Sequence, residues 1–191
     1  MICSLCPRQC AALRDETHGE GFCRMPSVPV CARAALHRWE EPCISGETGA
    51  GTVFFSGCTL VCVFCQNAAI SREGFGKALT DDELYAVFRR LADQGASCIE
   101  LVTPTHFTHA LARVLERPVP GGLPVVWNSG GCERASTLKT LEGKVDVYLP
   151  DLKYVTPELA ERYSGAADYP EHAKAAIREM VRQRGPVRLE K

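Results

Sequence analysis

Three cysteines, Cys58, Cys62 and Cys65, form a C-x3-C-x2-C pattern in the run from Gly57 to Asn67. One short loop therefore supplies three thiolates, and no fourth cysteine follows close by. A [4Fe–4S] cluster usually takes four Cys ligands. Three ligands leave one iron free to bind another group, as a catalytic zinc keeps an open position. A structural zinc loop and buried free thiols are the alternatives, but structural zinc prefers closed four-ligand sites, so the odd number favours a cluster.

A second group of cysteines lies near the N-terminus, where Cys3, Cys6, Cys10 and Cys23 follow a C-x2-C-x3-C-x12-C pattern. Four thiolates make a closed set, suited to structural zinc or to an auxiliary iron–sulfur cluster. Free thiols in a loop-rich segment are the alternative. The spacing does not identify the metal. No role is assigned to Trp39, Glu40 and Glu41, and four cysteines stand outside both groups: Cys98, which we expect in the core, and Cys31, Cys43 and Cys132.

The elements that must position these residues alternate between strand and helix from residue 51 onward. Apolar runs predict buried strands over 52–56, 97–102, 124–127 and 145–149. A capping box of Thr80 and Glu83 starts a helix that Gly95 ends. Further helices are predicted over 105–115 with Thr105 as cap, over 133–141, from Thr156 as N-cap, and over 168–184. This order predicts parallel βαβ units in a curved sheet.

The polar candidates follow these strands one by one. Cys58 comes after the first strand and the segment 103–106 after the second. Asn128 and Ser129 follow the third strand, and Asp151 and Lys153 follow the fourth. Ligands collect at the carboxyl ends of parallel strands. The sequence therefore predicts one shared site at this edge of the sheet.

Composition narrows the class of protein. The chain has 191 residues, is 46% hydrophobic and carries a formal net charge of −1. It is long enough for one core, and its charge gives no case for binding nucleic acid or an anionic membrane. No signal peptide and no 18-residue apolar stretch is visible. Eleven cysteines without a secretory signal indicate metal binding or chemistry rather than disulfides, and we expect a cytoplasmic, low-oxygen setting.

Six separated motifs resemble the radical S-adenosylmethionine (SAM) superfamily, and within it the pyruvate formate-lyase activating enzyme-like branch. They begin with the N-terminal cysteine motif and include the cluster loop. In chain order, they are the stretches 3–10, 39–46, 51–67, 102–107, 127–131 and 148–154. The resemblance covers nearly the whole chain. It implies a partial (βα) barrel, with residues 1–45 as a Cys-rich N-terminal segment and 46–191 as the barrel.

The resemblance also implies roles for the site residues. Cys58, Cys62 and Cys65 would hold a [4Fe–4S] cluster whose free iron binds the amino and carboxylate groups of SAM. Phe64 would lie against the adenine, and Lys153 would meet the SAM carboxylate with Asp151 beside it. Asn128 and Ser129 match a cation-binding pair but lack its negative charge. Thr105 would face the SAM amino group, because the Gly-Gly-Glu of many relatives is absent. His106 and His109 could pair on a metal, but first-turn helix polarity is the simpler interpretation.

The function implied is reductive cleavage of SAM to methionine and a 5′-deoxyadenosyl radical, which abstracts hydrogen from a substrate. A flavodoxin- or ferredoxin-like reductant would supply the electron. The substrate implied is a glycyl residue of a partner enzyme, which would make the protein an activase. A radical SAM enzyme acting on a small molecule or peptide, and a non-catalytic iron–sulfur or zinc-binding fragment, remain alternatives. Radical SAM cores resemble a partial barrel of six βα units, whereas four strands are counted in this sequence. We therefore expect a barrel truncated near an extended segment at 187–191.

Overall fold

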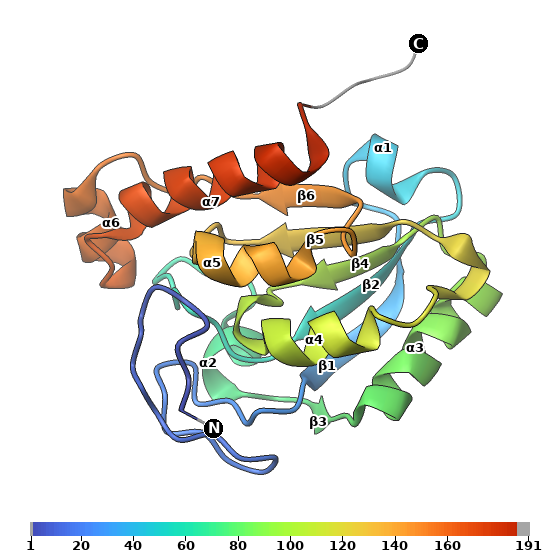
Figure 1. Ribbon diagram of the computed structural model, residues 1–191, viewed down its shortest axis with the longest axis horizontal. Helices are drawn as coiled ribbons and strands as arrows, with labels where there is room; N and C mark the ends of the chain where they lie inside the picture. Colours follow the sequence, from blue (N-terminus) through green and yellow to red (C-terminus); the bar gives the residue numbers. More distant parts are fainter. Residues whose placement is uncertain (1, 187–191) are drawn as a thin grey trace.

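The computed structural model describes residues 2–186, which form an open six-stranded sheet in the order β3-β1-β2-β4-β5-β6 (Figure 1). The predicted α/β partial barrel is confirmed. Strands β2, β4, β5 and β6 are parallel, and β1 pairs antiparallel with both β2 and β3. The strands are β1 (Val30–His37), β2 (Ala50–Phe55), β3 (Lys77–Ala78), β4 (Ile99–Val102), β5 (Val125–Ser129) and β6 (Val147–Pro150).

Strand β1 was not predicted. Its register against β2 shifts between Cys31 and Arg33, and such a bulge breaks the alternation that marks a strand in sequence. Its Ala-rich run also has low strand propensity. Because β1 and β2 lie on opposite sides of the predicted boundary at residue 45 and pair along most of their lengths, the segment before residue 45 contributes directly to the main sheet.

The helices largely follow the predictions. They are α1 (Pro42–Ser45), α2 (Ala68–Glu73), α3 (Asp81–Asp93), α4 (Thr108–Val114), α5 (Ala135–Leu138), α6 (Pro157–Ser164) and α7 (Tyr169–Arg184). The capping box of α3 is confirmed: Glu83 N–H donates to the Thr80 hydroxyl, and Thr80 N–H donates to the Glu83 carboxylate. Helix α7 ends at Gly185, as predicted.

The predicted cap at Thr105 is wrong, whereas Thr156 is the N-cap residue of α6 as predicted. The segment Thr105–Phe107 is a 3-10 turn, and α4 begins only at Thr108. The Thr105 hydroxyl does not cap it, because it donates to the Glu133 carboxylate. Thr156 occupies the N-cap position of α6 but makes no side-chain capping bond. The predicted extended segment at 187–191 lies outside the described residues.

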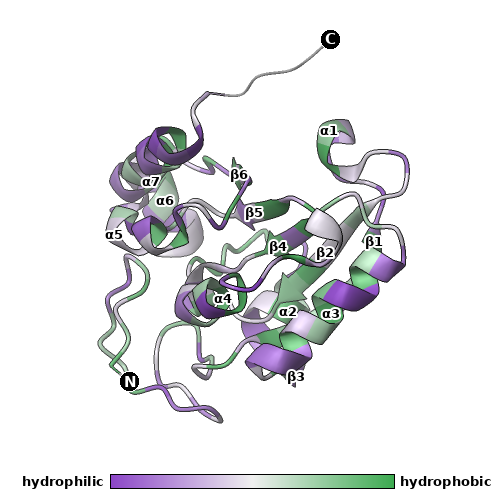
Figure 2. Cartoon of the chain, turned by 45° about the vertical axis from the view of Figure 1, so that its right-hand side comes forward, coloured by the Kyte–Doolittle hydropathy of each residue, from purple (hydrophilic) through white to green (hydrophobic). Residues whose placement is uncertain are grey.

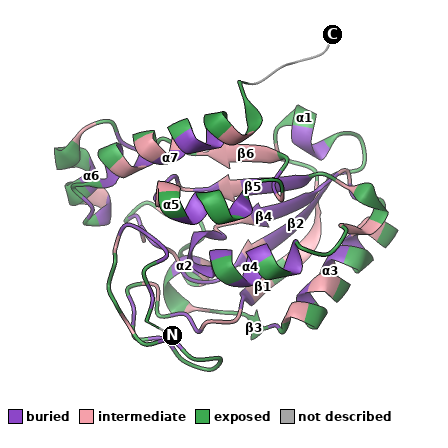
Figure 3. Cartoon of the chain, viewed as in Figure 1, coloured by how far each residue is buried: buried purple, intermediate pink, exposed green. Residues whose placement is uncertain are grey.

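The two faces of the sheet differ in their cover. Helices α3, α4, α5 and α7 pack against one face of the sheet (Figures 1 and 3). On that face the buried strands contribute Val53, Leu101 and Trp127 to the main core. Apolar residues dominate these strands in Figure 2. Because side chains alternate along a strand, Thr52, Glu100 and Asn128 point to the opposite face. That face carries the polar chemistry described below.

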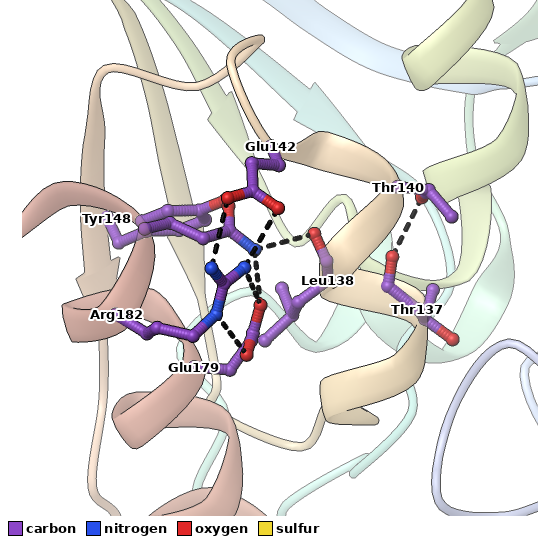
Figure 4. A network of polar contacts seen from close by, with 8 residues as sticks. Thr137, Leu138, Thr140, Glu142, Tyr148, Glu179 and Arg182 are labelled. Carbon is purple, nitrogen blue, oxygen red and sulfur yellow. Dashed lines mark hydrogen bonds and ion pairs between the residues drawn. The ribbon is translucent and has the colours of Figure 1, made fainter.

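A polar network fixes helix α7 to the far edge of the sheet (Figure 4). Arg182 donates to both Glu179 and Glu142, with contacts of 2.8–3.0 Å. Gln183 links the Leu138 carbonyl to the hydroxyl of Tyr148 on β6. These bonds hold α7 against α5 and β6, and so steady the strand that leads to Asp151 and Lys153.

Across residues 2–186, none of the helices combines the length and the apolar character that a membrane span requires.

Candidate functional site

A cavity of about 730 Å³ lies along the polar face of the sheet, at the carboxyl ends of β2, β4, β5 and β6. Every residue predicted for the shared site lines it: Cys58, Cys62, Phe64, Cys65, Thr105, Asn128, Ser129, Asp151 and Lys153. Parallel strands bring these side chains together although they span almost a hundred positions of sequence. Cys3, Cys6, Cys10 and Cys23 are not part of this lining.

The cluster loop, residues 58–65, is held from several directions. Val61 takes a left-handed backbone (φ 54°), and Cys65 N–H donates to the Cys62 carbonyl to form a turn. Arg72 also donates to the Cys62 carbonyl at 2.7 Å. From the N-terminal segment, Arg8 donates to the Thr59 carbonyl at 2.9 Å and to the carbonyls of Ser164 and Gly165 at the end of α6. The loop is therefore pre-shaped by three separate parts of the chain.

All three sulfur atoms of the loop accept hydrogen bonds. Leu60 N–H donates to Cys58 Sγ at 3.3 Å, the Ser164 hydroxyl donates to Cys62 Sγ at 3.0 Å, and the Ser71 hydroxyl lies 3.5 Å from Cys65 Sγ. Burial raises the pKa of Cys58, while backbone N–H groups lower it. Donors aimed at sulfur stabilise thiolates, and they tune bound iron–sulfur clusters.

Three thiolates from one loop match the ligands of an iron–sulfur cluster that leaves one iron open. Within residues 2–186 no three His, Cys, Asp or Glu side chains converge closely enough to hold one metal ion. A four-iron cluster spaces its thiolates more widely than one ion does. The loop thus presents three hydrogen-bonded sulfurs to an open cavity, which is the arrangement that a cluster with one accessible iron requires.

Glu133 is a buried carboxylate beside the site that the sequence analysis missed. Its carboxylate is 2% exposed and accepts from Trp127 Nε1 at 2.6 Å, from Thr105 at 3.1 Å and from Ser129 at 3.0 Å. Burial raises its pKa, and the three donors oppose that rise. No motif marks this residue in sequence; its position shortly after the third predicted strand was the available signal.

The hydrogen bonds to Glu133 determine which hydrogen-bonding groups Thr105 and Ser129 present to the cavity. Each hydroxyl has one proton, and each gives that proton to Glu133. The Thr105 oxygen therefore remains an acceptor on the cavity wall, and the Ser129 oxygen, which already accepts from Gly131 N–H at 3.3 Å, keeps one further lone pair. Acceptors suit a ligand ammonium group rather than a carboxylate.

A second missed carboxylate lies deeper on the polar face. Glu100 on β4 is fully buried and accepts from Thr52 at 2.6 Å and from the Asn128 amide at 2.8 Å. Glu40 shares hydrogen bonds with Glu100 and Glu41, and burial followed by these two neighbours raises its pKa to about 8. Glu40 and Glu41 line the same cavity as the cluster loop.

Asp151 and Lys153 form an ion pair of 2.5 Å beside the cavity. The loop that carries them is fixed by Tyr169, which is fully buried and whose hydroxyl accepts from Lys153 N–H at 2.9 Å. The same hydroxyl lies within hydrogen-bond distance of the Gly130 and Asp151 carbonyls. A glycine is required at 131, where φ is 72° and a Cβ would meet the Asp151 carbonyl oxygen at 2.5 Å.

Phe64 lies at the rim of the cavity with 59% of its surface exposed. Its ring contacts Tyr154 and Tyr163 edge-on, at centroid distances of 6.3 and 6.2 Å. These contacts hold the ring in place, and its exposed part remains available to a flat ligand.

The two histidines do not form a pair. His106 is buried, Nε2 lies 2.7 Å from the Ser56 carbonyl oxygen, and burial lowers its pKa to about 3. His109 is exposed, and neither histidine lines the cavity. The structure therefore gives a packing role to His106 and supports no metal pair at these two positions.

Comparison with known proteins agrees with this geometry. The family model of the radical SAM superfamily matches residues 52–188. An uncharacterized protein of Methanocaldococcus jannaschii, MJ0674, is 30% identical over 176 residues, covering 87% of this chain. The chain spans about half the length of that curated relative. With the family match running from the first parallel strand through the whole site, the chain belongs to the radical SAM superfamily.

Proposed function

We propose that this protein reductively cleaves SAM and that the resulting radical takes a hydrogen atom from a glycyl residue of a partner enzyme. The observation that carries the first part is the loop of three hydrogen-bonded cysteines opening into a cavity of about 730 Å³. Membership of the radical SAM superfamily supports a [4Fe–4S] cluster and SAM as cofactors.

In this proposal Cys58, Cys62 and Cys65 hold the cluster. When bound and reduced by a flavodoxin- or ferredoxin-type protein, such a cluster would supply the one electron that divides SAM into methionine and a 5′-deoxyadenosyl radical able to take a hydrogen atom. The chain's own residues bind and orient the reactants. Hydrogen bonds from Leu60, Ser71 and Ser164 to the sulfurs offset part of their negative charge.

The opposite wall of the cavity suits a zwitterion. Lys153 provides a cation for a carboxylate, and its neighbour Asp151 restrains it through their ion pair. Thr105 and Ser129, with their protons given to Glu133, provide acceptors for an ammonium group. Phe64 provides an exposed ring for the adenine.

A macromolecular substrate fits the rim of the cavity. Trp39 lines the cavity yet is 90% exposed, and Phe64 is more than half exposed. Large exposed aromatics beside a site are typical of protein contact surfaces. A glycyl Cα lies on a peptide backbone, so the partner must insert an extended loop past these rings. We place the reaction in the cytoplasm, where a protein reductant is available.

The test is anaerobic reconstitution with iron and sulfide, reduction, and measurement of 5′-deoxyadenosine after SAM is added. We expect product from the wild-type chain, and a loss of at least about 1,000-fold in a Cys62→Ala variant that retains its fold. Cys43→Ala, an exposed cysteine outside the cavity, is the matched control. A folded, cluster-loaded chain that yields no 5′-deoxyadenosine would overturn the proposal and favour a non-catalytic iron–sulfur protein.

The substrate is tested separately with a candidate glycyl-radical enzyme deuterated at its glycine Cα positions. Transfer of deuterium into 5′-deoxyadenosine supports the activase role. Turnover without transfer, accompanied by transfer from a deuterated small molecule or free peptide, assigns the second class of substrate instead.

A further inference from the structure

Ser164, the last residue of α6, donates a hydrogen bond of 3.0 Å to Cys62 Sγ. The donors to Cys58 Sγ and Cys65 Sγ lie farther away, at 3.3 and 3.5 Å. The Cys62 and Ser164 side chains are both buried, at 6% and 7% exposure. A hydrogen bond to an ionised group is stronger in such surroundings than in water, because the local dielectric is low. Cys62 therefore has the closest hydrogen-bond donor of the three cysteines in the cluster loop.

A tyrosine beside Ser164 completes a relay of two hydroxyl groups. The hydroxyl oxygens of Tyr154 and Ser164 lie 2.7 Å apart. A thiolate that binds iron has no proton to give, so Ser164 must donate to Cys62. A serine hydroxyl has a single proton, and Tyr154 must therefore be the donor to Ser164. The hydroxyl relay thus runs from Tyr154 through Ser164 to Cys62, and each hydrogen bond polarises the next.

The position of Tyr154 is fixed by the aromatic rings around it. Its side chain is 5% exposed, and its ring lies nearly parallel to that of Tyr163, at a centroid distance of 6.5 Å. It also meets the ring of Tyr169 edge-on at 5.4 Å. Cys62 and Tyr154 belong to the same buried cluster, which includes residues of α6 and α7. The Tyr154 hydroxyl therefore stays directed at Ser164 unless these rings move.

Arg8 holds the C-terminal end of α6 against the cluster loop. Its guanidinium donates to the Thr59 carbonyl in the loop at 2.9 Å and to the Ser164 carbonyl at 2.7 Å. A backbone bond adds a second link, because Val63 N–H in the loop donates to the Tyr163 carbonyl at 2.9 Å. These bonds fix the separation between the loop and the serine that donates to its sulfur.

The hydroxyl that reaches Cys65 is arranged differently. Ser71 Oγ lies 3.5 Å from Cys65 Sγ and 3.4 Å from the Ala68 carbonyl oxygen, so two acceptors compete for its single proton. The proton of Ser164, in contrast, is directed to the sulfur by the donation from Tyr154. The hydroxyl relay is therefore the more effective of the two side-chain donors.

We propose that Tyr154 and Ser164 raise the reduction potential of the cluster that the loop would hold, an inference that rests on the proposed function. On reduction, one electron from the protein reductant enters the cluster, no bond forms or breaks, and no proton is transferred. The added negative charge spreads onto the sulfur ligands, where the proton of Ser164 stabilises it. Ser164 acts directly on Cys62, whereas Tyr154 and Arg8 are positioning residues.

The test is a redox titration of the anaerobically reconstituted protein without SAM, followed by electron paramagnetic resonance of the reduced cluster. Ser164→Ala should lower the equilibrium constant for reduction about tenfold, which is about 59 mV for one electron. Tyr154→Phe should lower the potential by a smaller amount, because Ser164 can still donate. Ser164→Thr keeps a hydroxyl and should keep the wild-type potential.

The matched controls are Ser45→Ala and Tyr85→Phe. Ser45 is a buried serine, and the hydroxyls of both residues donate to backbone carbonyls rather than to sulfur. Both variants should keep the wild-type potential. A cluster-loaded Ser164→Ala variant with the wild-type potential overturns the proposal, and if that variant loads no cluster, an unchanged potential in Tyr154→Phe does so.

The titration also separates this proposal from the proposed function, because SAM is absent from it. Shifted potentials in a protein that yields no 5′-deoxyadenosine contradict SAM cleavage and support the hydroxyl relay. Unshifted potentials in a protein that does yield 5′-deoxyadenosine contradict the relay alone. A wild-type chain that takes up no iron and sulfide contradicts both.

Discussion

Asn128 donates a hydrogen bond of 2.8 Å to the buried carboxylate of Glu100 on the neighbouring strand. The bond fixes the side chain of a residue that lines the cavity, and it leaves the Asn128 carbonyl oxygen as an acceptor. Together with the Thr52 hydroxyl, it provides a partner for each oxygen of Glu100. The buried carboxylate of Glu100 therefore fixes the side chains of Thr52 and Asn128 on the polar face of the sheet.

Replacing Asn128 tests this arrangement. Asn128→Ala removes one of the donors to a fully buried carboxylate, which should lower the free energy of unfolding by about 1–3 kcal/mol. Urea denaturation of the metal-free chain measures it. Gln94→Ala, an exposed polar residue outside the cavity, should change the value by less than about 0.5 kcal/mol. Equal stability of the two variants contradicts the structural role of the bond.

Glu133 should act on SAM binding through Thr105 and Ser129. Glu133→Gln replaces one acceptor oxygen with an NH₂ group that must face a donor, so at least one hydroxyl turns its proton toward the cavity. We expect the dissociation constant for SAM to rise about tenfold or more, which corresponds to about 1.4 kcal/mol. Equilibrium dialysis with the reconstituted protein measures it.

The control for this prediction is Glu158→Gln, at an exposed position in the first turn of α6. It should leave SAM binding unchanged. If Glu133→Gln binds SAM as tightly as the wild type while losing stability, Glu133 supports packing alone, and the assignment of Thr105 and Ser129 as ammonium acceptors fails.

The sequence was sufficient for the parts of this site that rest on local pattern. The C-x3-C-x2-C loop, the capping box of α3 and the four parallel strands each have a short-range signature, and strand order then brings Asn128 and Lys153 to the same edge. Family membership confirms the iron–sulfur and SAM chemistry at the level of the superfamily. The roles of the individual residues remain predictions.

The missed residues depend on partners that are distant in sequence. Glu100 is identified as buried and paired only when Thr52 and Asn128 arrive from the strands on either side. Glu133 accepts from two strand ends at once, so its environment exists only in the folded chain. Strand β1 was not predicted, because a bulge interrupts the alternation of apolar and polar residues and its Ala-rich composition is not typical of a strand.

Glu40 should make stability depend on pH in the neutral range. Its pKa is raised from 4.5 to about 8 by burial and by the carboxyl groups of Glu100 and Glu41, so the folded chain holds a proton there that the unfolded chain has lost. Its contribution to stability is complete below about pH 4.5 and is lost as pH rises through about 8. We expect the wild-type midpoint of thermal unfolding to fall between pH 5 and pH 8.5 relative to Glu40→Gln. Parallel midpoints across this range contradict the shared proton.

The ion pairs of Arg182 should make stability fall as pH decreases, which is the opposite of the pH dependence expected from Glu40. Arg182 lowers the pKa of Glu179 to about 2, so the stability that this carboxylate contributes is present above about pH 4.5 and is lost as pH falls toward 2. Arg182→Ala removes the cation beside Glu179 and should lower the free energy of unfolding at pH 7. The control, Arg178→Ala, removes an exposed arginine from the same helix and should cost far less. Denaturation is measured at pH 7 and at pH 3, and the loss of unfolding free energy in Arg182→Ala should be smaller at pH 3. An equal loss at both pH values would assign the effect to lost packing of the arginine stem rather than to the charge pair.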